Sequence, residues 1–293
     1  MVFQSVSEIG DLIPGKRLAD RYEIVKANRQ GGLSVAFEVL DLSDGSPREM
    51  QFFPSSLFDG EREARDFASS WEPWRRVDSP HVLALREILP VGSSSLFLIH
   101  DVPSGACLRD KVEKGERVEA AQVIDLGLQL LDGLSEIHAH GLVHGDVKPT
   151  TVFVDRGGES GDGWAAQLVD GGTTHGLWTA KDLGERTALI GTPYYAPVEQ
   201  FGGDPPTVQS DLYNVATLLF ELVSGAQPWA GKSFLEVFQA KLERTPPTIG
   251  SRAPGVEVDP ELEATIAGGL HAELDSRYAA AREFRDRLAA CAS

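Results

Sequence analysis

The sequence predicts an α+β chain in two parts, a smaller part of mostly antiparallel strands followed by a larger part made mainly of helices. Up to about residue 99, apolar residues alternate in short segments, as is typical of half-buried strands. From residue 119 onward they recur at helical spacing over longer segments. A length of 293 residues suits one large domain of this kind.

The smaller part combines several strands with one main helix. After an irregular leader over residues 1–20, the expected strands cover residues 21–26, 35–39, 48–53, 83–88 and 96–99. A glycine-containing turn at residues 29–34 joins the first two strands into a hairpin. Residues 60–77 carry a helical pattern that Pro73 should end or kink. We expect its tryptophans, Trp71 and Trp74, to be packing residues rather than a binding patch.

Two long helices dominate the larger part. Residues 119–139 place apolar residues such as Leu131 and Leu134 at helical spacing. Residues 210–224 are apolar on most faces, which indicates a helix buried on all sides and ended by Gly225. Shorter amphipathic helices are expected at residues 233–243, 260–270 and 279–291.

The composition describes an acidic chain that can bury a sizeable core. Apolar residues make up 42% of the chain, and 44 acidic against 27 basic residues give a net charge of −17. Nucleic acid and anionic membranes require a basic face, so we expect neither as a partner. Cys107 and Cys291 form neither a metal-ligand spacing nor a disulfide framework, which favours a cytoplasmic location. We predict no membrane-spanning segment and no secretory signal.

Three short motifs in the larger part point to phosphoryl transfer. The run from His144 through Gly145, Asp146 and Val147 to Lys148 lies between the helix at 119–139 and a short strand. An aspartate there can accept a hydroxyl proton while a lysine two residues later neutralises charge on the transferred group. The other two motifs are Asp170-Gly171-Gly172 and Pro197-Val198-Glu199. Their order and spacing are hard to obtain by chance.

On these motifs the chain resembles a bacterial Ser/Thr protein kinase domain of the eukaryotic-like (Hanks) type. The three runs stand where that family has His-Arg-Asp, Asp-Phe-Gly and Ala-Pro-Glu, and none of the three is intact. The resemblance implies a bilobal protein-kinase-like fold and a single domain over residues 1–293. The leader and N-lobe would occupy residues 1–99, the hinge 100–102 and the C-lobe 103–293.

The resemblance implies that part of the catalytic machinery is retained. Asp146 and Lys148 stand at the catalytic positions, and Asp170 stands at the position of the magnesium carboxylate. Thr151 replaces the asparagine that helps hold magnesium, and a hydroxyl is a poorer magnesium ligand. Glu199 is expected to pair with Arg277 in the ion pair that holds the C-lobe together. The resemblance implies two further features. Asp211 should brace the catalytic loop, and residues 171–190 should form a mobile activation segment.

The predicted nucleotide site departs most from the family. Gln51 replaces the strand lysine that holds the phosphates, and Ser70 replaces the helix glutamate that pairs with that lysine. Glu49 replaces a small alanine of the adenine slot, and Phe153 replaces a smaller leucine of its floor. We predict that these two side chains occlude the slot. Asp101, in the hinge, would contribute mostly backbone hydrogen bonds.

The glycine turn and two motif glycines extend this pattern. Gly31 and Gly32 remain in the turn that would cover the nucleotide, but Arg29 and Ser34 replace two of the three family glycines. An ordinary hairpin is therefore expected more than a close phosphate cradle. Two further side chains of the family motifs are missing: Gly145 replaces the arginine of His-Arg-Asp, and Gly171 replaces the phenylalanine of Asp-Phe-Gly.

These observations leave two main functions open. In the first, the domain is a pseudokinase, a signalling scaffold or regulatory binding module with protein partners and no cofactor. In the alternative, it is a weakly active or unconventional Ser/Thr protein kinase that uses ATP and Mg²⁺, with Arg29 reaching toward the phosphates in place of Gln51. A third reading makes the acidic domain a platform on which phosphorylated Thr187 or Thr192 recruits a partner.

Overall fold

The computed structural model describes residues 9–30, 33–92, 94–156, 163–181, 194–243 and 245–292. These residues form two compact units, each described here by itself. The first unit contains the described residues within Met1–Asp78, Leu83–Pro103 and Gly176–Asp182. The second contains those within Ser79–Val82, Ser104–His175 and Leu183–Ser293. The predicted single domain over residues 1–293, with its hinge at 100–102, stays a prediction.

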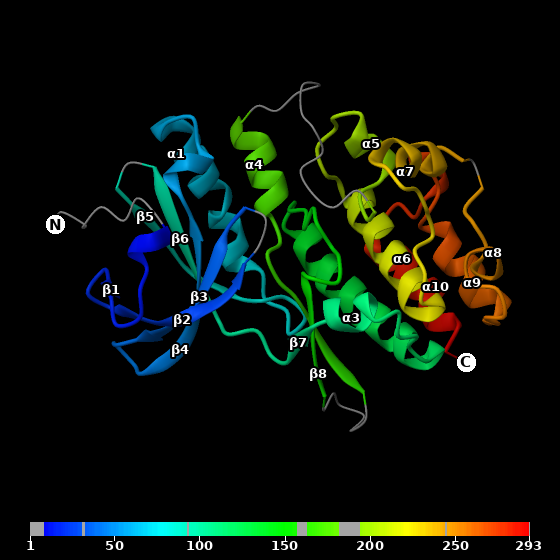
Figure 1. Ribbon diagram of the computed structural model, residues 1–293, viewed down its shortest axis with the longest axis horizontal. Helices are drawn as coiled ribbons and strands as arrows, with labels where there is room; N and C mark the ends of the chain where they lie inside the picture. Colours follow the sequence, from blue (N-terminus) through cyan, green and yellow to red (C-terminus); the bar gives the residue numbers. More distant parts are fainter. Residues whose placement is uncertain are drawn as a thin grey trace. The chain divides into compact units, whose positions relative to one another are not determined.

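The first unit is built on a six-stranded sheet with the strand order β1-β2-β3-β4-β6-β5 and antiparallel pairing throughout (Figure 1). Its strands are β1 (Arg17–Leu18), β2 (Tyr22–Gln30), β3 (Val35–Asp41), β4 (Ser46–Phe53), β5 (Leu85–Val91) and β6 (Ser95–His100). The strands expected from period-two alternation are therefore present. Strand β1 was not predicted, because two residues are too few to show an alternation.

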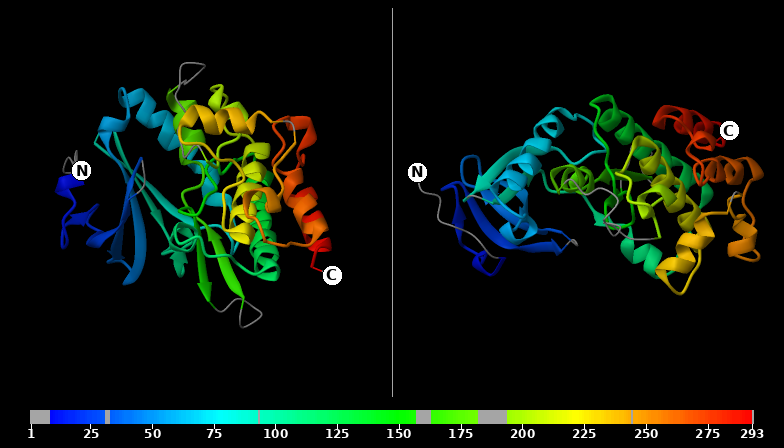
Figure 2. Two further views of the ribbon diagram at one scale, coloured as in Figure 1. Left: turned by 45° about the vertical axis from the view of Figure 1, so that its right-hand side comes forward. Right: turned by 90° about the horizontal axis from the view of Figure 1, so that it is seen from above.

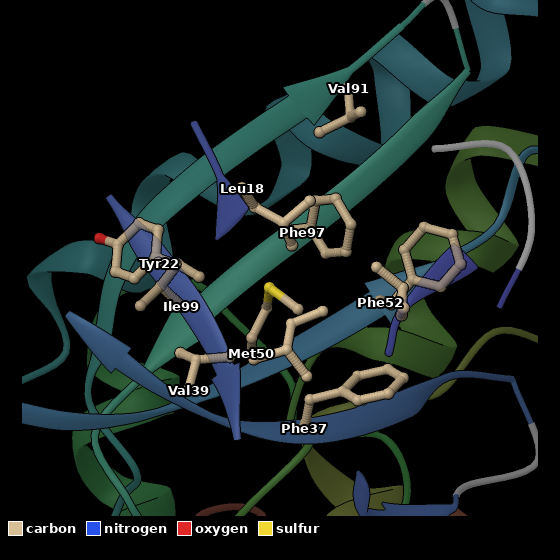
Figure 3. Packing of buried hydrophobic residues seen from close by; sticks show 11 residues of the cluster. Leu18, Tyr22, Phe37, Val39, Met50, Phe52, Val91, Phe97 and Ile99 are labelled. Atoms are coloured by element: carbon tan, nitrogen blue, oxygen red, sulfur yellow. The ribbon is translucent and has the colours of Figure 1, made fainter. Parts of the chain in front are cut away.

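One face of this sheet carries the main apolar core of the first unit (Figure 3). Met50 and Phe52 of β4 point to this face and are fully buried, and the ring of Phe52 stacks on that of Phe97 with centroids 4.8 Å apart. Since side chains alternate along a strand, Glu49, Gln51 and Phe53 point to the opposite face.

The opposite face is packed against α1 (Glu61–Ser70) and the short 3-10 helix η3 (Glu72–Arg76). The ring of Phe53 lies 5.0 Å from that of Phe67 and 6.3 Å from that of Trp71, measured between centroids. Trp71 and Trp74 are 2% and 7% exposed, which confirms that they are packing residues. The helix ends at Ser70, three residues before Pro73. Short 3-10 helices, η1 (Ile9–Asp11) and η2 (Ser55–Leu57), complete this unit.

The second unit is mainly helical and is organised around α3 (Ala120–Ala139) and α6 (Val208–Ser224). Thr207 and Ser210 form a capping box at the start of α6, and Gly225 ends it with a φ of 74°. The C-terminal helix α10 (Ala281–Ala290) packs along α3 (Figure 2). The remaining elements are α2 (Arg109–Glu113), α5 (Val198–Phe201), α7 (Phe234–Lys241), α8 (Ile249–Arg252), α9 (Pro260–Gly268), η4 (Leu274–Ser276), and a three-stranded sheet of β7 (Ala106–Cys107), β8 (Val152–Arg156) and β9 (Trp164–Leu168).

Helix α4 (Thr173–Lys181) corrects one expectation. The sequence predicted a mobile segment over residues 171–190, but its first half is helical, and residues 182–193 lie outside the described part of the chain. Leu177 of α4 is 1% exposed, and its Lys181 ammonium lies 3.3 Å from the Glu63 carboxylate of α1. A Cβ at Gly176 would lie 2.8 Å from Ser70 Oγ and 3.1 Å from a ring carbon of Phe67, so α4 packs closely on α1 at this glycine.

Within the described ranges, no helix combines enough length with enough apolar character to cross a bilayer.

Candidate functional site

The catalytic-loop motif of the second unit is held from beneath by one buried carboxylate. Asp211, on α6, is fully buried and accepts hydrogen bonds from His144 N at 2.9 Å and Gly145 N at 2.7 Å. His138 Nε2 lies 2.9 Å from the same carboxylate. Gly145 has a φ of 81°, a conformation that glycine adopts without strain. The expected brace by Asp211 is therefore present, and it fixes the backbone just before Asp146.

Within the loop, the two retained catalytic residues bind each other. The ammonium of Lys148 lies 2.5 Å from Asp146 Oδ2, and the two side chains are 18% and 24% exposed. Such a charge-assisted hydrogen bond orients both groups. The geometry brings together the base and the cation that the sequence predicted there.

Thr151 uses its hydroxyl to close this loop. Its Oγ1 donates to the Asp146 carbonyl at 2.7 Å and accepts from Lys148 N at 3.0 Å. The side chain is only 4% exposed. A hydroxyl with both of these bonds inside the loop is poorly placed to serve as a magnesium ligand, and the metal role of Thr151 stays a prediction.

His144 joins the catalytic loop to the segment that contains Asp170. Its Nε2 lies 3.1 Å from the Val169 carbonyl, and its Nδ1 accepts from Asp146 N at 3.3 Å. Because a carbonyl can only accept, Nε2 carries the proton and the ring is neutral. Burial, partly opposed by the charges of nearby aspartates, lowers the pKa of His144 below its ordinary value.

Asp170 has a left-handed backbone with a φ of 61°, which aspartate tolerates better than most residues. Its neighbours are fixed by backbone bonds, from Val169 N to the Thr151 carbonyl at 3.0 Å and from Gly172 N to the His144 carbonyl at 2.9 Å. The loops that carry Asp146 and Asp170 are therefore tied together. In the described part of the chain, no three His, Cys, Asp or Glu side chains form a preassembled metal cluster.

The first unit contains the most consequential departure from the family pattern. Glu49 is 0% exposed, and the guanidinium of Arg29 binds its carboxylate with Nη2 at 2.6 Å from Oε1 and Nε at 3.1 Å from Oε2. Asn28 Nδ2 donates to Oε2 at 2.9 Å. The carboxylate is therefore buried but paired, which removes most of the desolvation penalty of an isolated charge.

A β-bulge explains how two successive residues reach the same carboxylate. In the β2–β3 pairing, Ala27 faces Phe37 and Arg29 faces Ala36, so Asn28 is an extra residue on β2. A bulge breaks the alternation of side chains along a strand and re-aims them. The guanidinium of Arg29 is thus engaged by Glu49, and the suggestion that Arg29 replaces the strand lysine at the phosphates stays a prediction.

The positions of the family's lysine–glutamate pair hold two neutral side chains in local hydrogen bonds. Gln51 is 2% exposed, and its Nε2 donates to Ser34 Oγ at 2.8 Å. Ser70 Oγ donates to the Phe67 carbonyl at 2.7 Å, within α1. Neither side chain offers a cation for phosphate.

The predicted hinge residue is bound by arginines. The Asp101 carboxylate accepts from Arg86 Nε at 2.9 Å and from Arg48 Nη1 at 3.2 Å. Its backbone N–H donates to the Ala84 carbonyl at 3.2 Å, so this donor is already used. Its role in nucleotide binding stays a prediction.

The remaining predicted site residues lie either on β8 or outside the described part of the chain. Phe153 lies on β8, where it pairs with Gln167 of β9 and Cys107 of β7, and its side chain is half-buried. Gly31, Gly32, Thr187 and Thr192 lie outside the described residues.

The structural ion pair of the second unit is confirmed. Arg277 Nη1 and Nη2 lie 2.8 Å and 2.9 Å from the two carboxylate oxygens of Glu199. The Arg277 side chain is 0% exposed, and its guanidinium lies 4.8 Å from the ring centroid of Tyr213. Sequence reasoning missed a neighbour of this pair, the buried Lys241, because lysines are almost never fully buried and nothing in the sequence sets this one apart.

Comparison with known proteins places the chain in a family. A family model described as the protein kinase domain matches residues 30–285. The serine/threonine-protein kinase PkaB of Streptomyces coelicolor is 35% identical over 157 residues, which cover 53% of this chain and 37% of PkaB. The serine/threonine-protein kinase PknB of Mycobacterium leprae is 25% identical over 281 residues, with coverage of 92% and 43%. The chain thus spans about two fifths of the length of these relatives.

Solved structures show the same fold. The kinase domain of Mycobacterium tuberculosis PknI matches with a TM-score of 0.71 and 18% identity, over 96% of this chain and 99% of that chain. Rad53 residues 1–466 in complex with AMP-PNP matches with a TM-score of 0.73 and 16% identity, over 93% of this chain and 66% of that chain. Because the family model covers most of the sequence and the fold agrees with it, the chain belongs to the protein kinase domain family.

Proposed function

We propose that this domain is a pseudokinase, a catalytically impaired member of the protein kinase family that acts as a signalling scaffold or regulatory binding module. The observation that carries this proposal is the buried Glu49 carboxylate bound by Arg29 and Asn28. It fills a position that the family keeps small, with an ion pair that is costly to open. The residues of the first unit therefore do not fit a nucleoside triphosphate.

The missing groups add a second argument. The strand lysine and its glutamate partner are replaced by Gln51 and Ser70, and the hydroxyl of Thr151 is used within the loop. If lysine, magnesium ligand and glycine cradle each supply ~3 kcal/mol of transition-state stabilisation, their loss slows transfer roughly 10⁶-fold.

The second candidate is a weakly active or unconventional Ser/Thr kinase that uses ATP and Mg²⁺. The specific observation in its favour is that Asp146, Lys148 and Asp170 are retained, with the first two in direct contact. The relatives are named as Ser/Thr kinases, and their names favour this candidate over the first. Against this candidate stand the buried Glu49 carboxylate and Gln51 at the position of the strand lysine.

Thermal melting with and without ATP and Mg²⁺ or Mn²⁺ separates the two candidates. A ligand that binds only the folded state at saturation raises the melting temperature by several degrees, on the order of the shift expected for 2–3 kcal/mol. The pseudokinase proposal expects no shift. A clear shift, together with transfer of labelled γ-phosphate that Asp146→Ala abolishes, would establish the kinase instead.

The remaining features of the proposal concern partners and location. A net charge of −17 supports protein partners rather than nucleic acid or a membrane surface. A cytoplasmic location stays a prediction from the cysteine pattern. If the domain acts by binding, Asp146→Ala should leave its cellular role intact, whereas a loss of that role would indicate catalysis.

A further inference from the structure

The amino group of Lys241, on α7, lies in the interior of the second unit. The residue is only 1% exposed. An ammonium group is costly to bury unless a carboxylate pairs with it. Within the described ranges, no carboxylate forms an ion pair with this lysine. The charged form of Lys241 is therefore unfavourable at its position in the fold.

The carboxylate that acts on Lys241 is already used by a second buried cation. This carboxylate belongs to Glu199 of α5, and Arg277 donates to both of its oxygens, at 2.8 Å and 2.9 Å. The Arg277 guanidinium and the Lys241 amino group both lie near the ring of Tyr213, at 4.8 Å and 5.2 Å from its centroid. Two basic groups thus share one carboxylate. Because arginine keeps its charge in proteins, the lysine is the group that can give up a proton.

The hydrogen bonds of Lys241 do not require its charge. Its amino group donates to the carbonyls of Tyr194 at 2.8 Å and Ala196 at 2.7 Å. An ammonium has three N–H donors and a neutral amine has two, so both bonds can form in either state. The rings of Tyr213 and Phe201, with centroids at 5.2 Å and 5.6 Å, favour the charged form.

Burial outweighs this attraction to the rings. It lowers the pKa of Lys241 well below its ordinary value of 10.5. The charge of Arg277 acts in the same direction, and that of Glu199 opposes it. Uptake of a proton therefore favours a conformation in which the amino group reaches water.

The two hydrogen bonds join α7 to residues 194–196, the segment that leads into α5. Figure 1 shows α5 and α7 side by side. The ring of Phe238 also stacks on that of Phe201, with centroids 5.1 Å apart. A stacked ring pair does not respond to pH, whereas the attachment through Lys241 depends on the protonation of one amine.

We propose that Lys241 is a proton-sensitive anchor, in which the neutral amine holds α7 to residues 194–196 and protonation loosens this attachment. The anchor goes beyond the proposed function, because it operates whether or not the chain binds a nucleotide. It would make the mobility of α7 and of the segment before α5 depend on pH.

The other titratable groups of this region act with the opposite sign or are exposed. Burial raises the pKa of Tyr213, and it raises the pKa values of Tyr195 and Glu221, which are hydrogen-bonded to each other. A group with a raised pKa loses its stabilising contribution as the pH rises. Lys241, with a lowered pKa, adds stability as the pH rises toward 10.5. The other charged residue of α7, Glu236, is exposed.

Urea denaturation of the whole chain between about pH 7.5 and pH 9.5 tests the anchor in the parent, in Lys241→Met and in Lys232→Met. Lys232 is exposed just before α7 and is the matched control. A lysine that is neutral in the folded chain takes up a proton on unfolding, which lowers the unfolding constant by up to about tenfold per pH unit as the pH rises.

We expect the unfolding constant of the parent to fall by about threefold or more relative to that of Lys241→Met over this range, while Lys232→Met follows the parent. A smaller difference between the parent and Lys241→Met would overturn the proposal. An equal loss of the pH dependence in Lys232→Met would overturn it as well, because the effect would then belong to surface charge.

Hydrogen exchange in the parent keeps the test decisive if Lys241→Met does not fold. After correction for the intrinsic pH dependence of exchange, the opening constant of the α7 amides should fall by about threefold or more over the same range. His144 and His175, whose ordinary pKa is 6.5, have largely finished titrating below this range. An opening constant that stays level or rises would contradict the anchor. None of these results depends on the outcome of melting with ATP.

Discussion

The guanidinium of Arg29 donates hydrogen bonds to both carboxylate oxygens of the buried Glu49, from Nη2 to Oε1 at 2.6 Å and from Nε to Oε2 at 3.1 Å. The Arg29 side chain is 19% exposed and that of Glu49 is 0% exposed. A carboxylate in this position has no access to water, so its stability depends on its arginine and asparagine partners.

Removal of Arg29 alone should be strongly destabilising. Arg29→Met leaves the Glu49 carboxylate buried with only Asn28 as a partner, and loss of one member of a buried pair costs about 3–5 kcal/mol. The double variant Arg29→Met/Glu49→Met should recover most of this loss, because apolar groups of similar volume can replace a buried pair. Urea denaturation of both variants measures the difference. If the single and double variants are equally stable, the buried Glu49 carboxylate does not depend on its ion pair with Arg29.

Reopening the first unit should restore nucleotide affinity if Glu49 blocks it. The triple variant Arg29→Gly/Glu49→Ala/Gln51→Lys returns three positions to the family pattern. We expect ATP with Mg²⁺ to raise its melting temperature by a few degrees while the parent does not respond. Gln51→Lys alone, which leaves the carboxylate in place, is the matched control and should behave like the parent.

Acid should destabilise the second unit through His144. Burial lowers the pKa of its imidazole in the folded state below the ordinary value of 6.5. Below pH 6.5 the unfolded chain therefore binds a proton that the folded chain does not, and the free energy of unfolding falls as the pH falls. The contribution of His144 is fully present above pH 6.5.

A second histidine, His175, acts on the same titration. His175 is also buried enough for its pKa to be lowered, so the two histidines work in the same direction. Denaturation of the parent and of His144→Gln between pH 7 and pH 5 separates them. A parent whose stability is unchanged over this range would contradict the neutral, buried state of His144.

Lys241 should be important for stability through its hydrogen bonds to two backbone carbonyls. Lys241→Met keeps most of the aliphatic volume but leaves the carbonyls of Tyr194 and Ala196 without their donor. An unsatisfied buried acceptor costs about 1–3 kcal/mol, so we expect a loss of that order. The exposed Lys232→Met is the control and should change the free energy of unfolding by no more than about 0.5 kcal/mol.

The approach of α4 to α1 gives a steric prediction. Gly176→Ala would place a Cβ 2.8 Å from Ser70 Oγ and 3.1 Å from a ring carbon of Phe67. Although alanine favours a helix more than glycine, the clash should dominate and destabilise the fold by about 1–3 kcal/mol. Ser70→Gly should relieve part of this loss when combined with Gly176→Ala. If Gly176→Ala is as stable as the parent, helix propensity outweighs the contact.

The sequence by itself determined the fold and the order of its elements. Period-two alternation predicted the five longer strands of the first unit, and helical spacing predicted α3 and α6, because burial of one face imposes these periods. The three motifs predicted the family, and the pairing of Glu199 with Arg277 followed from it. Each of these features depends on local pattern or on a motif of fixed order.

Only the tertiary structure decided how the departures from the family pattern are accommodated. The partner of Glu49 depends on a bulge in β2 that places Asn28 and Arg29 on the same carboxylate, and a bulge leaves no period in the sequence. Helix α4 depends on its close contact with α1 at Gly176, and the buried state of Lys241 depends on carbonyls 45 and 47 residues away. These contacts join residues distant in sequence, so their energies appear only once the chain is packed.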